Sequence, residues 1–187
     1  MPRNGTEVRR RLQEAALELY AANGFDQTTT AEIATLAGVT ERTFFRHFAD
    51  KREVVFDGEA ALIEMLVDGV RRAPDGGAPM EVLLHAFRSV VALVEANRPF
   101  LTPRQKVIEA APALRERALA KAAAITTALS AALVERGLNS PLAMLAAQTG
   151  IAAFGYATNT WHSDPSSGLN NHLDVAFARL RGLASTG

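Results

Sequence analysis

Two short helical segments joined by a glycine turn constrain this chain more than any other feature of its 187 residues. The first segment ends in the apolar run Ile33–Ala37, and Gly38 follows it directly. A glycine just past such a run supplies the left-handed backbone that ends a helix. Thr40 then stands two residues later as a suitable N-cap for a second helix. The spacing predicts a helix-turn-helix.

The residues on either side of the turn fit the same motif. Thr29 and Glu32 have the spacing of a capping box at the start of the first helix. The second helix is expected over residues 41–48, with Phe44 and Phe48 one turn apart on its inward side. Its other side carries polar groups, which a helix-turn-helix presents to the major groove of DNA. An ordinary charged surface helix is the alternative, and the turn before the helix argues against it.

The segment from Gly24 to Lys51, GFDQTTTAEIATLAGVTERTFFRHFADK, resembles the DNA-binding signature of TetR/AcrR-family bacterial transcriptional regulators. That signature runs glycine-aromatic, paired Thr/Ser, Ile-Ala, Ala-Gly-Val-Ser/Thr, then Thr-Leu-Tyr-x-His/Tyr-Phe-x-x-Lys. The match ends within the N-terminal third of the chain, and the C-terminal regions of the family diverge widely. One departure is Phe45, which replaces the usual tyrosine and lacks the hydroxyl that can reach a phosphate. Phe45 can still contact a thymine methyl group.

The expected DNA contacts fall into two groups. An arginine can bridge O6 and N7 of guanine, so the polar side of the second helix is expected to read base edges. The candidates for base contact are Arg42, Thr43 and Arg46, beside Phe45. The residues expected to hold phosphates and set the register are Thr29, Thr40, His47 and Lys51. The role of Lys51 follows from the resemblance, in which this lysine contacts a phosphate.

Composition allows a DNA-binding protein without favouring one. The 20 lysines and arginines balance 20 aspartates and glutamates, so any attraction to nucleic acid must come from local segregation of charge. The absence of cysteine excludes disulfides, thiolate metal sites and cysteine nucleophiles. We see no signal peptide and no apolar run near the roughly 18 residues of a membrane-spanning helix. The chain is therefore expected to be cytoplasmic.

The sequence predicts helices throughout. The alternation typical of strands is absent, and alanine and leucine dominate. We expect an all-α chain of about nine helices. Its N-terminal three-helix DNA-binding module should span residues 1–50, and a larger helical domain for effector binding and dimerisation should span 51–187. Beyond the helix-turn-helix, the helices are expected over residues 6–22, 51–72, 80–96, an irregular 100–109, 113–136, 141–161 and 169–184.

The last two helices carry a signal for dimerisation. The first has small residues at helical spacing, where backbones can approach closely, and the second has an apolar stripe. Two such helices from each protomer would form a four-helix interface, as in TetR-like proteins, and a two-fold pair can read two half-sites. The alternative is that both stripes face the protomer's own core. The residues expected at the interface are Ala143, Ala147, Gly150, Phe154, Leu173, Phe177 and Leu180.

The resemblance also implies that the C-terminal helices enclose a cavity for a small, often apolar effector. Apolar residues in such a set are also what an ordinary core requires. Arg104 and Gln105 are the favoured polar contacts, for a carboxylate or a phosphate such as that of an acyl thioester. The candidates for effector contact are Phe87, Arg88, Val91, Phe100, Arg104, Gln105, Ile108, Ile125, Phe154 and Asn159.

Other chemistry has no motif behind it. His162, Asp164, His172 and Asp174 flank a Pro-Ser-Ser-Gly loop without the ligand spacing of a metal site, and a solvated loop is the interpretation. No nucleophile elbow or phosphate loop occurs, so neither catalytic residues nor a cofactor are predicted, and an enzyme is not expected.

We interpret the chain as a homodimeric, sequence-specific DNA-binding regulator, a repressor that a small effector releases from its operator. One alternative is a ligand-independent architectural DNA binder. The other is a helical small-molecule-binding adaptor or enzyme in which the N-terminal module is incidental.

Overall fold

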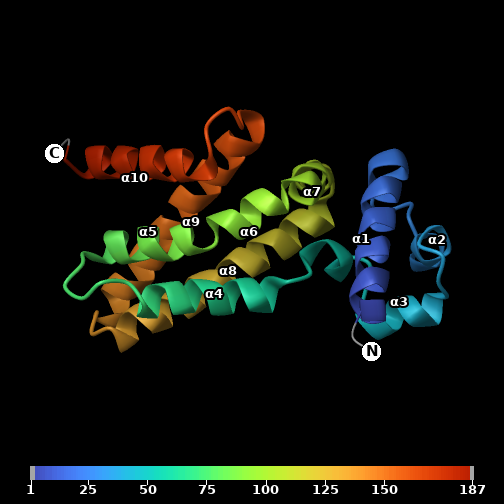
Figure 1. Cartoon of the computed structure of the whole chain (residues 1–187), viewed down its shortest axis with the longest axis horizontal. Coiled ribbons are helices and arrows are strands. Elements are labelled where there is room, and N and C mark those ends of the chain that lie inside the picture. Colours follow the sequence, from blue (N-terminus) through green and yellow to red (C-terminus); the bar gives the residue numbers. More distant parts are fainter. Residues whose placement is uncertain (1–2, 186–187) are drawn as a thin grey trace. The chain divides into compact units, whose positions relative to one another are not determined.

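A computed structural model describes residues 3–185, and every regular element in this part of the chain is a helix (Figure 1). The α-helices are α1 (Arg3–Asn23), α2 (Thr30–Leu36), α3 (Glu41–His47), α4 (Glu59–Arg71), α5 (Pro79–Ser89), α6 (Val91–Ala96), α7 (Arg98–Ala110), α8 (Pro112–Glu135), α9 (Ser140–Ser163) and α10 (Leu169–Ser185), and a 3-10 helix, η1, spans Glu53–Phe56. Only Val90 separates α5 from α6. When these two are taken as one broken helix, the described residues confirm the predicted all-α chain of about nine helices.

The chain divides into two compact units. The first contains residues 1–58 and 99–120, and the second contains residues 59–98 and 121–187. Most of α7 and the start of α8 therefore belong to the same unit as the helix-turn-helix. The functional division into residues 1–50 and 51–187 stays a prediction.

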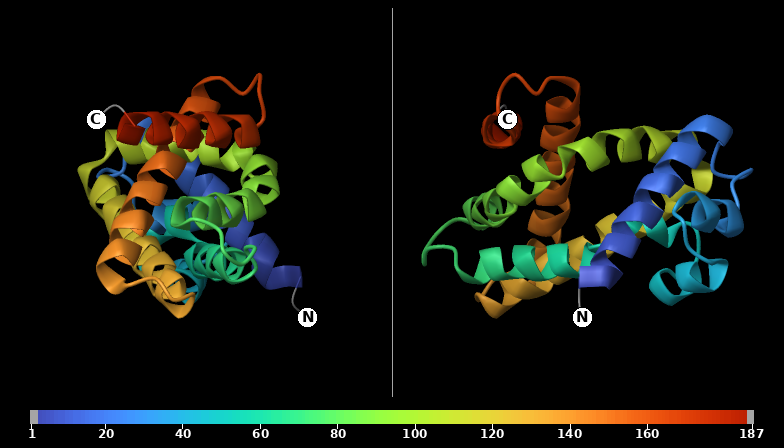
Figure 2. Two further views of the ribbon diagram at one scale, coloured as in Figure 1. Left: turned by 90° about the vertical axis from the view of Figure 1, so that its left-hand side faces the viewer. Right: turned by 45° about the vertical axis from the view of Figure 1, so that its right-hand side comes forward.

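The core of the first unit lies where α1 packs on α2 and η1, and where α2 packs on α3. Figure 2 shows α1, α2 and α3 from two further sides. Leu12 of α1, Ile33 of α2 and Phe44 of α3 are fully buried in this core. The later segments of the unit contribute the buried residues Val107, Ile108, Ala111 and Leu114.

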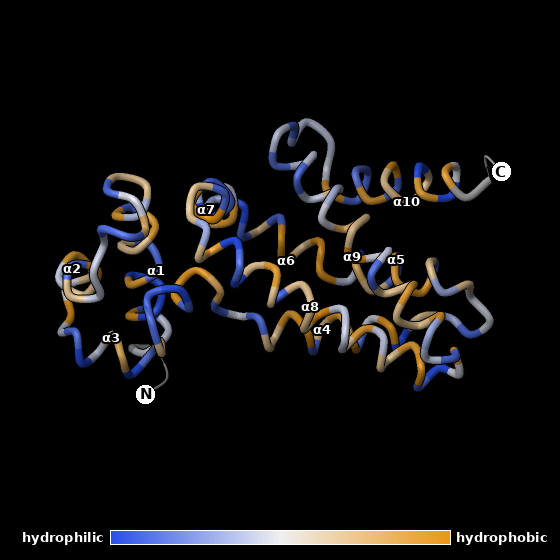
Figure 3. Tube along the Cα trace, turned by 180° about the vertical axis from the view of Figure 1, so that it is seen from behind, coloured by the Kyte–Doolittle hydropathy of each residue, from blue (hydrophilic) through white to orange (hydrophobic). Residues whose placement is uncertain are grey.

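The second unit is built around aromatic residues from three helices. In it α10 packs along α9, α4 packs on α5, and α5 packs on α9. The Phe87 ring of α5 is fully buried, stacks on Phe154 of α9 at 4.7 Å and lies 6.1 Å from Phe177 of α10. Polar and apolar residues alternate along α10 (Figure 3), and its apolar side, with Leu173, faces this core.

The helix expected over residues 51–72 is two elements, η1 and α4. Gly58 lies between them with a left-handed backbone, φ 81°, which a helix does not contain. The first helix also begins earlier than expected, at Arg3. The helix-turn-helix is therefore not followed by one long helix.

Two further predicted bounds were wrong. The helix expected over residues 80–96 breaks at Val90, next to Ser89, whose hydroxyl donates to the carbonyl of Ala86 at 2.7 Å. Such a local bond competes with the helical backbone pattern. The segment around Pro103 was expected to be irregular and is part of a regular helix, α7.

The expectation that the chain has no apolar run as long as a membrane-spanning helix was also wrong. One helix of the described residues is long and apolar enough to meet that test. The helix α8 contains an 18-residue window of mean hydropathy 1.4, and 33% of that window is buried. A core helix of a folded domain passes the same test. Leu129, Ala132 and Leu133 of α8 lie in the core of the second unit, which is the placement of a packed helix.

Candidate nucleic-acid interface

The helix-turn-helix has the caps and the turn that its sequence predicts. The amide of Thr29 donates to the carboxylate of Glu32 at 2.8 Å, and the amide of Glu32 donates to the Thr29 hydroxyl at 3.2 Å. Gly38 has φ 68°, so it takes the left-handed conformation expected at the turn. The hydroxyl of Thr40 then accepts a hydrogen bond from the amide of Thr43 at 3.2 Å and caps α3. These local bonds fix where both helices begin.

The helix α3 has one buried side and one open side. Phe44 and Phe48 are 0% and 4% exposed, as predicted for the inward side. On the open side Phe45 is 52% exposed, between exposed Arg42 and Arg46. Neither arginine makes a hydrogen bond or an ion pair to any residue in the described range 3–185. Two guanidinium groups are thus available to an outside partner beside an exposed aromatic ring.

Lys51 does not have this freedom. Its ammonium group donates to the carbonyls of Phe25, Asp26 and Thr28 at 2.8, 3.3 and 2.9 Å, and lies 4.4 Å from the centre of the Phe25 ring. An ammonium has three donors, so all of them are used. The Tyr20 hydroxyl in turn donates to the Lys51 carbonyl at 2.6 Å. Lys51 thus closes the loop that leads into α2, and its predicted phosphate contact stays a prediction.

His47 is half-buried, and its Nε2 atom has no hydrogen-bond partner in the described part of the chain. Loss of solvent around the ring lowers the pKa of His47, and the nearby charges of Arg46 and Arg9 lower it further, while Asp57 opposes them. These effects favour the neutral imidazole in the absence of DNA. The predicted contact of His47 with a phosphate stays a prediction.

Four residues predicted to contact an effector lie in the first unit with the helix-turn-helix. The guanidinium of Arg104 donates to the carbonyl of Val55 and lies 4.9 Å from the centre of the Phe56 ring. Burial lowers the pKa of Arg104 to about 10, so the group stays charged at neutral pH. The remaining three are also used locally: Gln105 donates to Glu109, and Phe100 and Ile108 pack in the first core.

Arg104 is therefore a structural partner of η1, and its predicted role at an effector carboxylate or phosphate stays a prediction. Arg117 of α8 joins it there, with its Nε donating to Glu53 at 2.6 Å and its guanidinium 5.1 Å from the Phe56 ring centre. The sequence analysis missed Arg117. Arg117 and Glu53 are 64 positions apart in the sequence, so no local spacing could have indicated the pair.

The other predicted effector residues lie in the second unit. Phe87 and Phe154 are brought together, but their rings stack directly on each other. Val91 and Ile125 are buried in the same core. Arg88 is paired with Asp174 of α10 at 2.5 Å. These contacts are what an ordinary core and its rim require, so any effector that uses these side chains must displace some of them.

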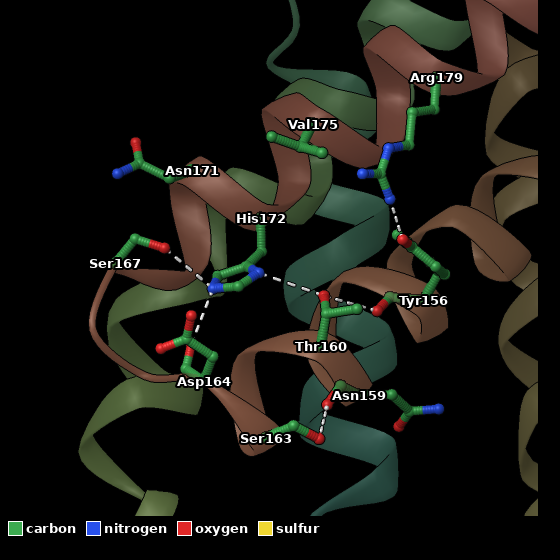
Figure 4. A pocket seen from close by; sticks show the side chains of 10 residues that line it. All are labelled: Tyr156, Asn159, Thr160, Ser163, Asp164, Ser167, Asn171, His172, Val175 and Arg179. Atoms are coloured by element: carbon green, nitrogen blue, oxygen red, sulfur yellow. Dashed lines mark hydrogen bonds between the residues drawn. The ribbon is translucent and has the colours of Figure 1, made fainter.

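A groove of about 680 Å³ lies between the C-terminal half of α9 and α10 (Figure 4). Asn159 is the predicted effector residue that lines it. The ring of His172 joins its two sides through the hydroxyls of Thr160 and Ser167, at 3.2 and 3.0 Å, and Arg179 donates to the hydroxyl of Tyr156. Polar side chains therefore link the two helices across the groove. No group of three or more potential metal ligands occurs in the described residues.

Most residues predicted at the dimer interface are inside the protomer. Ala143, Ala147, Leu173 and Phe177 are at most 1% exposed, and Gly150 is buried. Phe154 and Leu180 are half-buried. The small residues of α9 thus serve the protomer's own packing, which was the alternative interpretation. The large apolar residues exposed on the same two helices are Leu142, Met144, Leu145, Tyr156, Val175 and Leu183.

Comparison with known proteins agrees with this geometry. Residues 12–57 match the family described as bacterial regulatory proteins, tetR family, and residues 77–184 match the MftR C-terminal domain. The chain belongs to the tetR family of bacterial regulatory proteins. It carries an MftR-type C-terminal domain. The predicted family and the predicted helix-turn-helix module are thereby confirmed.

Two curated relatives share the N-terminal part of this tetR-family chain. The HTH-type transcriptional regulator TcmR of Streptomyces glaucescens is 39% identical over 87 residues, which are 46% of this chain and 38% of TcmR. The putative mycofactocin biosynthesis transcriptional regulator MftR of Mycobacterium tuberculosis is 33% identical over 79 residues, which are 37% of this chain and 40% of MftR. The chain thus matches about two fifths of the length of each relative.

The likeness to solved structures extends over nearly the whole chain. The crystal structure of Thermus thermophilus FadR, a TetR family transcriptional repressor in complex with lauroyl-CoA, has a TM-score of 0.55 and 27% sequence identity. The alignment covers 91% of this chain and 91% of FadR. The arrangement of helices in this tetR-family chain is therefore shared with a ligand-bound regulator.

Replacing Lys51 tests its placement. Lys51→Met leaves three carbonyl groups without their donor, so we expect the free energy of unfolding to fall by about 1–3 kcal/mol in urea titrations. The salt dependence of DNA binding should equal that of the wild type, because no phosphate contact is lost. A slope reduced by about one, with unchanged stability, would show that Lys51 holds a phosphate. Lys106→Met, at an exposed position of α7, is the matched control.

Proposed function

We propose that this chain is a homodimeric, sequence-specific transcriptional repressor whose two α3 helices read the two halves of a pseudo-palindromic operator. The observation that carries the proposal is the pair of unpaired, exposed guanidinium groups of Arg42 and Arg46 on a helix locked into a core by its opposite side. DNA binding then belongs to the first unit, and effector binding and dimerisation belong to the second. The protein would act in the bacterial cytoplasm, where the DNA is.

The residues of α3 divide by their chemistry. Arg42 and Arg46 can each bridge guanine O6 and N7, and Phe45 between them can cover a thymine methyl group. Thr43 is half-buried, with its hydroxyl 3.1 Å from that of Thr40. We assign base contacts to Arg42, Thr43 and Arg46. We assign phosphate contacts to Thr29 and Thr40, which cap the starts of α2 and α3, and to His47 at the end of α3.

Arg46 tests base readout. Enrichment of bound sequences from a random DNA library should first yield an operator. On that operator Arg46→Ala should cost about 1–3 kcal/mol, or roughly 5- to 150-fold in affinity, and should erase the preference at one base position. Arg72→Ala, which removes an exposed arginine just after the end of α4, should leave the affinity and the base preference unchanged. Equal losses for Arg46→Ala on operator and scrambled DNA would contradict the assignment.

The dimer is supported by the outer sides of α9 and α10. Leu145 of α9 is 59% exposed, and Tyr156 on the same helix is 44% exposed. Val175 of α10 is 47% exposed. Covering such residues with the same helices of a second protomer would remove apolar surface from water. A pair is also what specific binding needs, since each protomer offers one recognition helix.

A charge on this outer side should separate the protomers. Leu145→Asp is expected to convert the dimer to a folded monomer in size-exclusion chromatography with light scattering, because an unpaired carboxylate would be buried at the interface. Leu93→Asp on α6 introduces the same charge at a leucine of comparable exposure, 42%, and should stay dimeric. A dimer that survives Leu145→Asp, or a wild type that is monomeric at all concentrations, would overturn the proposed interface.

We also propose that a small effector with an apolar part binds in the second unit. Support comes from the MftR-type domain over residues 77–184 and from the lauroyl-CoA bound to Thermus thermophilus FadR. The apolar residues predicted to contact it, Phe87, Val91, Ile125 and Phe154, are close-packed. An inserted acyl chain would have to open the stack of Phe87 on Phe154. A ligand that binds only the opened state shifts the protein toward that state, which couples binding to rearrangement.

Acyl-CoA esters of increasing chain length test this effector class. At least one ester should raise the melting temperature of the protein and weaken its binding to the selected operator, with coenzyme A alone as the control. An ester that stabilises the protein but leaves operator affinity unchanged would contradict release by an effector. If no ester stabilises it, acyl-CoA is the wrong class.

A further inference from the structure

Arg9 of α1 makes three contacts where the recognition helix ends. Its Nε donates to the carboxylate of Asp57 at 2.6 Å, and its Nη2 donates to the carbonyl of His47 at 3.3 Å. The guanidinium also lies 4.9 Å from the centre of the Phe48 ring. One side chain thus touches the last residue of α3, the residue that caps α3, and the acid that follows η1.

The end of α3 is where such support matters. The helix has seven residues, and a helix of that length is not stable by itself. The carbonyls of its last turn lack helical partners and carry partial negative charge, which a cation stabilises. The backbone amide of Phe48 satisfies the carbonyl of Phe44 at 2.9 Å, and Arg9 reaches the carbonyl of His47.

Asp57 holds the other side of this contact. Its Oδ2 also accepts from Gln13 Nε2 at 3.4 Å, one turn after Arg9 on α1. The side chain of Asp57 is 23% exposed and that of Arg9 is 42% exposed. Two residues of α1 therefore fix a carboxylate at the end of η1, and this carboxylate orients the guanidinium that reaches α3.

The neighbouring Arg10 shows that an arginine on α1 does not necessarily contact the end of α3. Arg10 forms ion pairs with Glu7 and Glu14 on its own helix, and its side chain is 54% exposed. These are surface pairs of small energetic value. Arg9 and Arg10 carry the same charge on the same helix, but only Arg9 reaches α3 in the described structure.

We propose that Arg9 and Asp57 are positioning residues for DNA recognition: Arg9 acts through the carbonyl of His47 and the ring of Phe48, and not through a DNA phosphate. This inference rests on the proposed DNA-binding function. Its particular consequence concerns Asp57. Loss of an acid near DNA strengthens binding if only charge matters, and weakens specific binding if the acid holds α3 in place.

The test compares Arg9→Ala, Arg9→Lys, Asp57→Asn and the double variant Arg9→Ala/Asp57→Asn on the selected operator and on scrambled DNA. We expect Arg9→Ala and Asp57→Asn each to lose about tenfold in operator affinity with little loss on scrambled DNA, because base contacts require a fixed helix. The double variant should lose no more than the worse single variant, since both act through one contact. The slope of affinity against salt should not change.

The matched controls each remove one positive or one negative charge from exposed positions of α1. Arg10→Ala and Glu14→Gln should leave operator affinity within about twofold of the wild type, as changes to solvated surface pairs do. Arg9→Lys keeps the charge but cannot make the forked contact, so its affinity should lie nearer to Arg9→Ala than to the wild type. Circular dichroism and thermal unfolding verify that each variant is folded. If Arg9→Ala does not fold, the operator affinities of Arg9→Lys and Asp57→Asn test the inference in its place.

Two results would overturn the inference. One is Asp57→Asn binding the operator as tightly as the wild type or more tightly. The other is a salt slope for Arg9→Ala that falls by about one, with losses equal on both DNAs, which is the signature of a phosphate contact. Failure of the proposed function looks different, because the wild type would then select no operator and Arg46→Ala would change nothing.

Discussion

A helix of seven residues cannot hold its own shape in water, and both helices of the helix-turn-helix, α2 and α3, have seven residues. Their stability must come from their ends and from the core beneath them. The capping box at Thr29 and the cap at Thr40 fix where the helices start. Lys51 closes the loop before α2, and Arg9 supports the end of α3. The position of the DNA-reading surface is thus set by groups other than the two arginines that are proposed to read bases.

Local chemistry could be predicted from the sequence, and long-range pairing could not. The caps, the left-handed Gly38 and the inward side of α3 follow from residues within four positions of each other. Lys51 was assigned to a phosphate from the family resemblance, and Arg104 to an effector from its place beside Pro103. Their partners lie 23 or more residues away in sequence, among the backbone carbonyls, which have no side-chain signal. The predicted interface is a different case, because small residues on α9 fit a protomer core as well as a partner.

In the proposed division of work, the first unit binds DNA and the second binds the effector. In the first, Arg42 and Arg46 are left without internal partners, while the other cations near α3 are committed to the fold. In the second, the stacked rings of Phe87 and Phe154 fill the space in which an effector would insert. Binding there must therefore compete with packing, and this competition is a physical route by which a ligand could change the state of the protein.

The most direct measurement of the central claim is hydroxyl-radical footprinting of the full chain on its selected operator. Two α3 helices carried by one dimer should protect two short patches related by two-fold symmetry, with centres about 34 Å or one helical turn apart, or a multiple of it. Arg46→Ala should remove both patches together. A single asymmetric patch, or protection that spreads along the fragment without a limit as protein is added, would contradict a dimer that reads two half-sites.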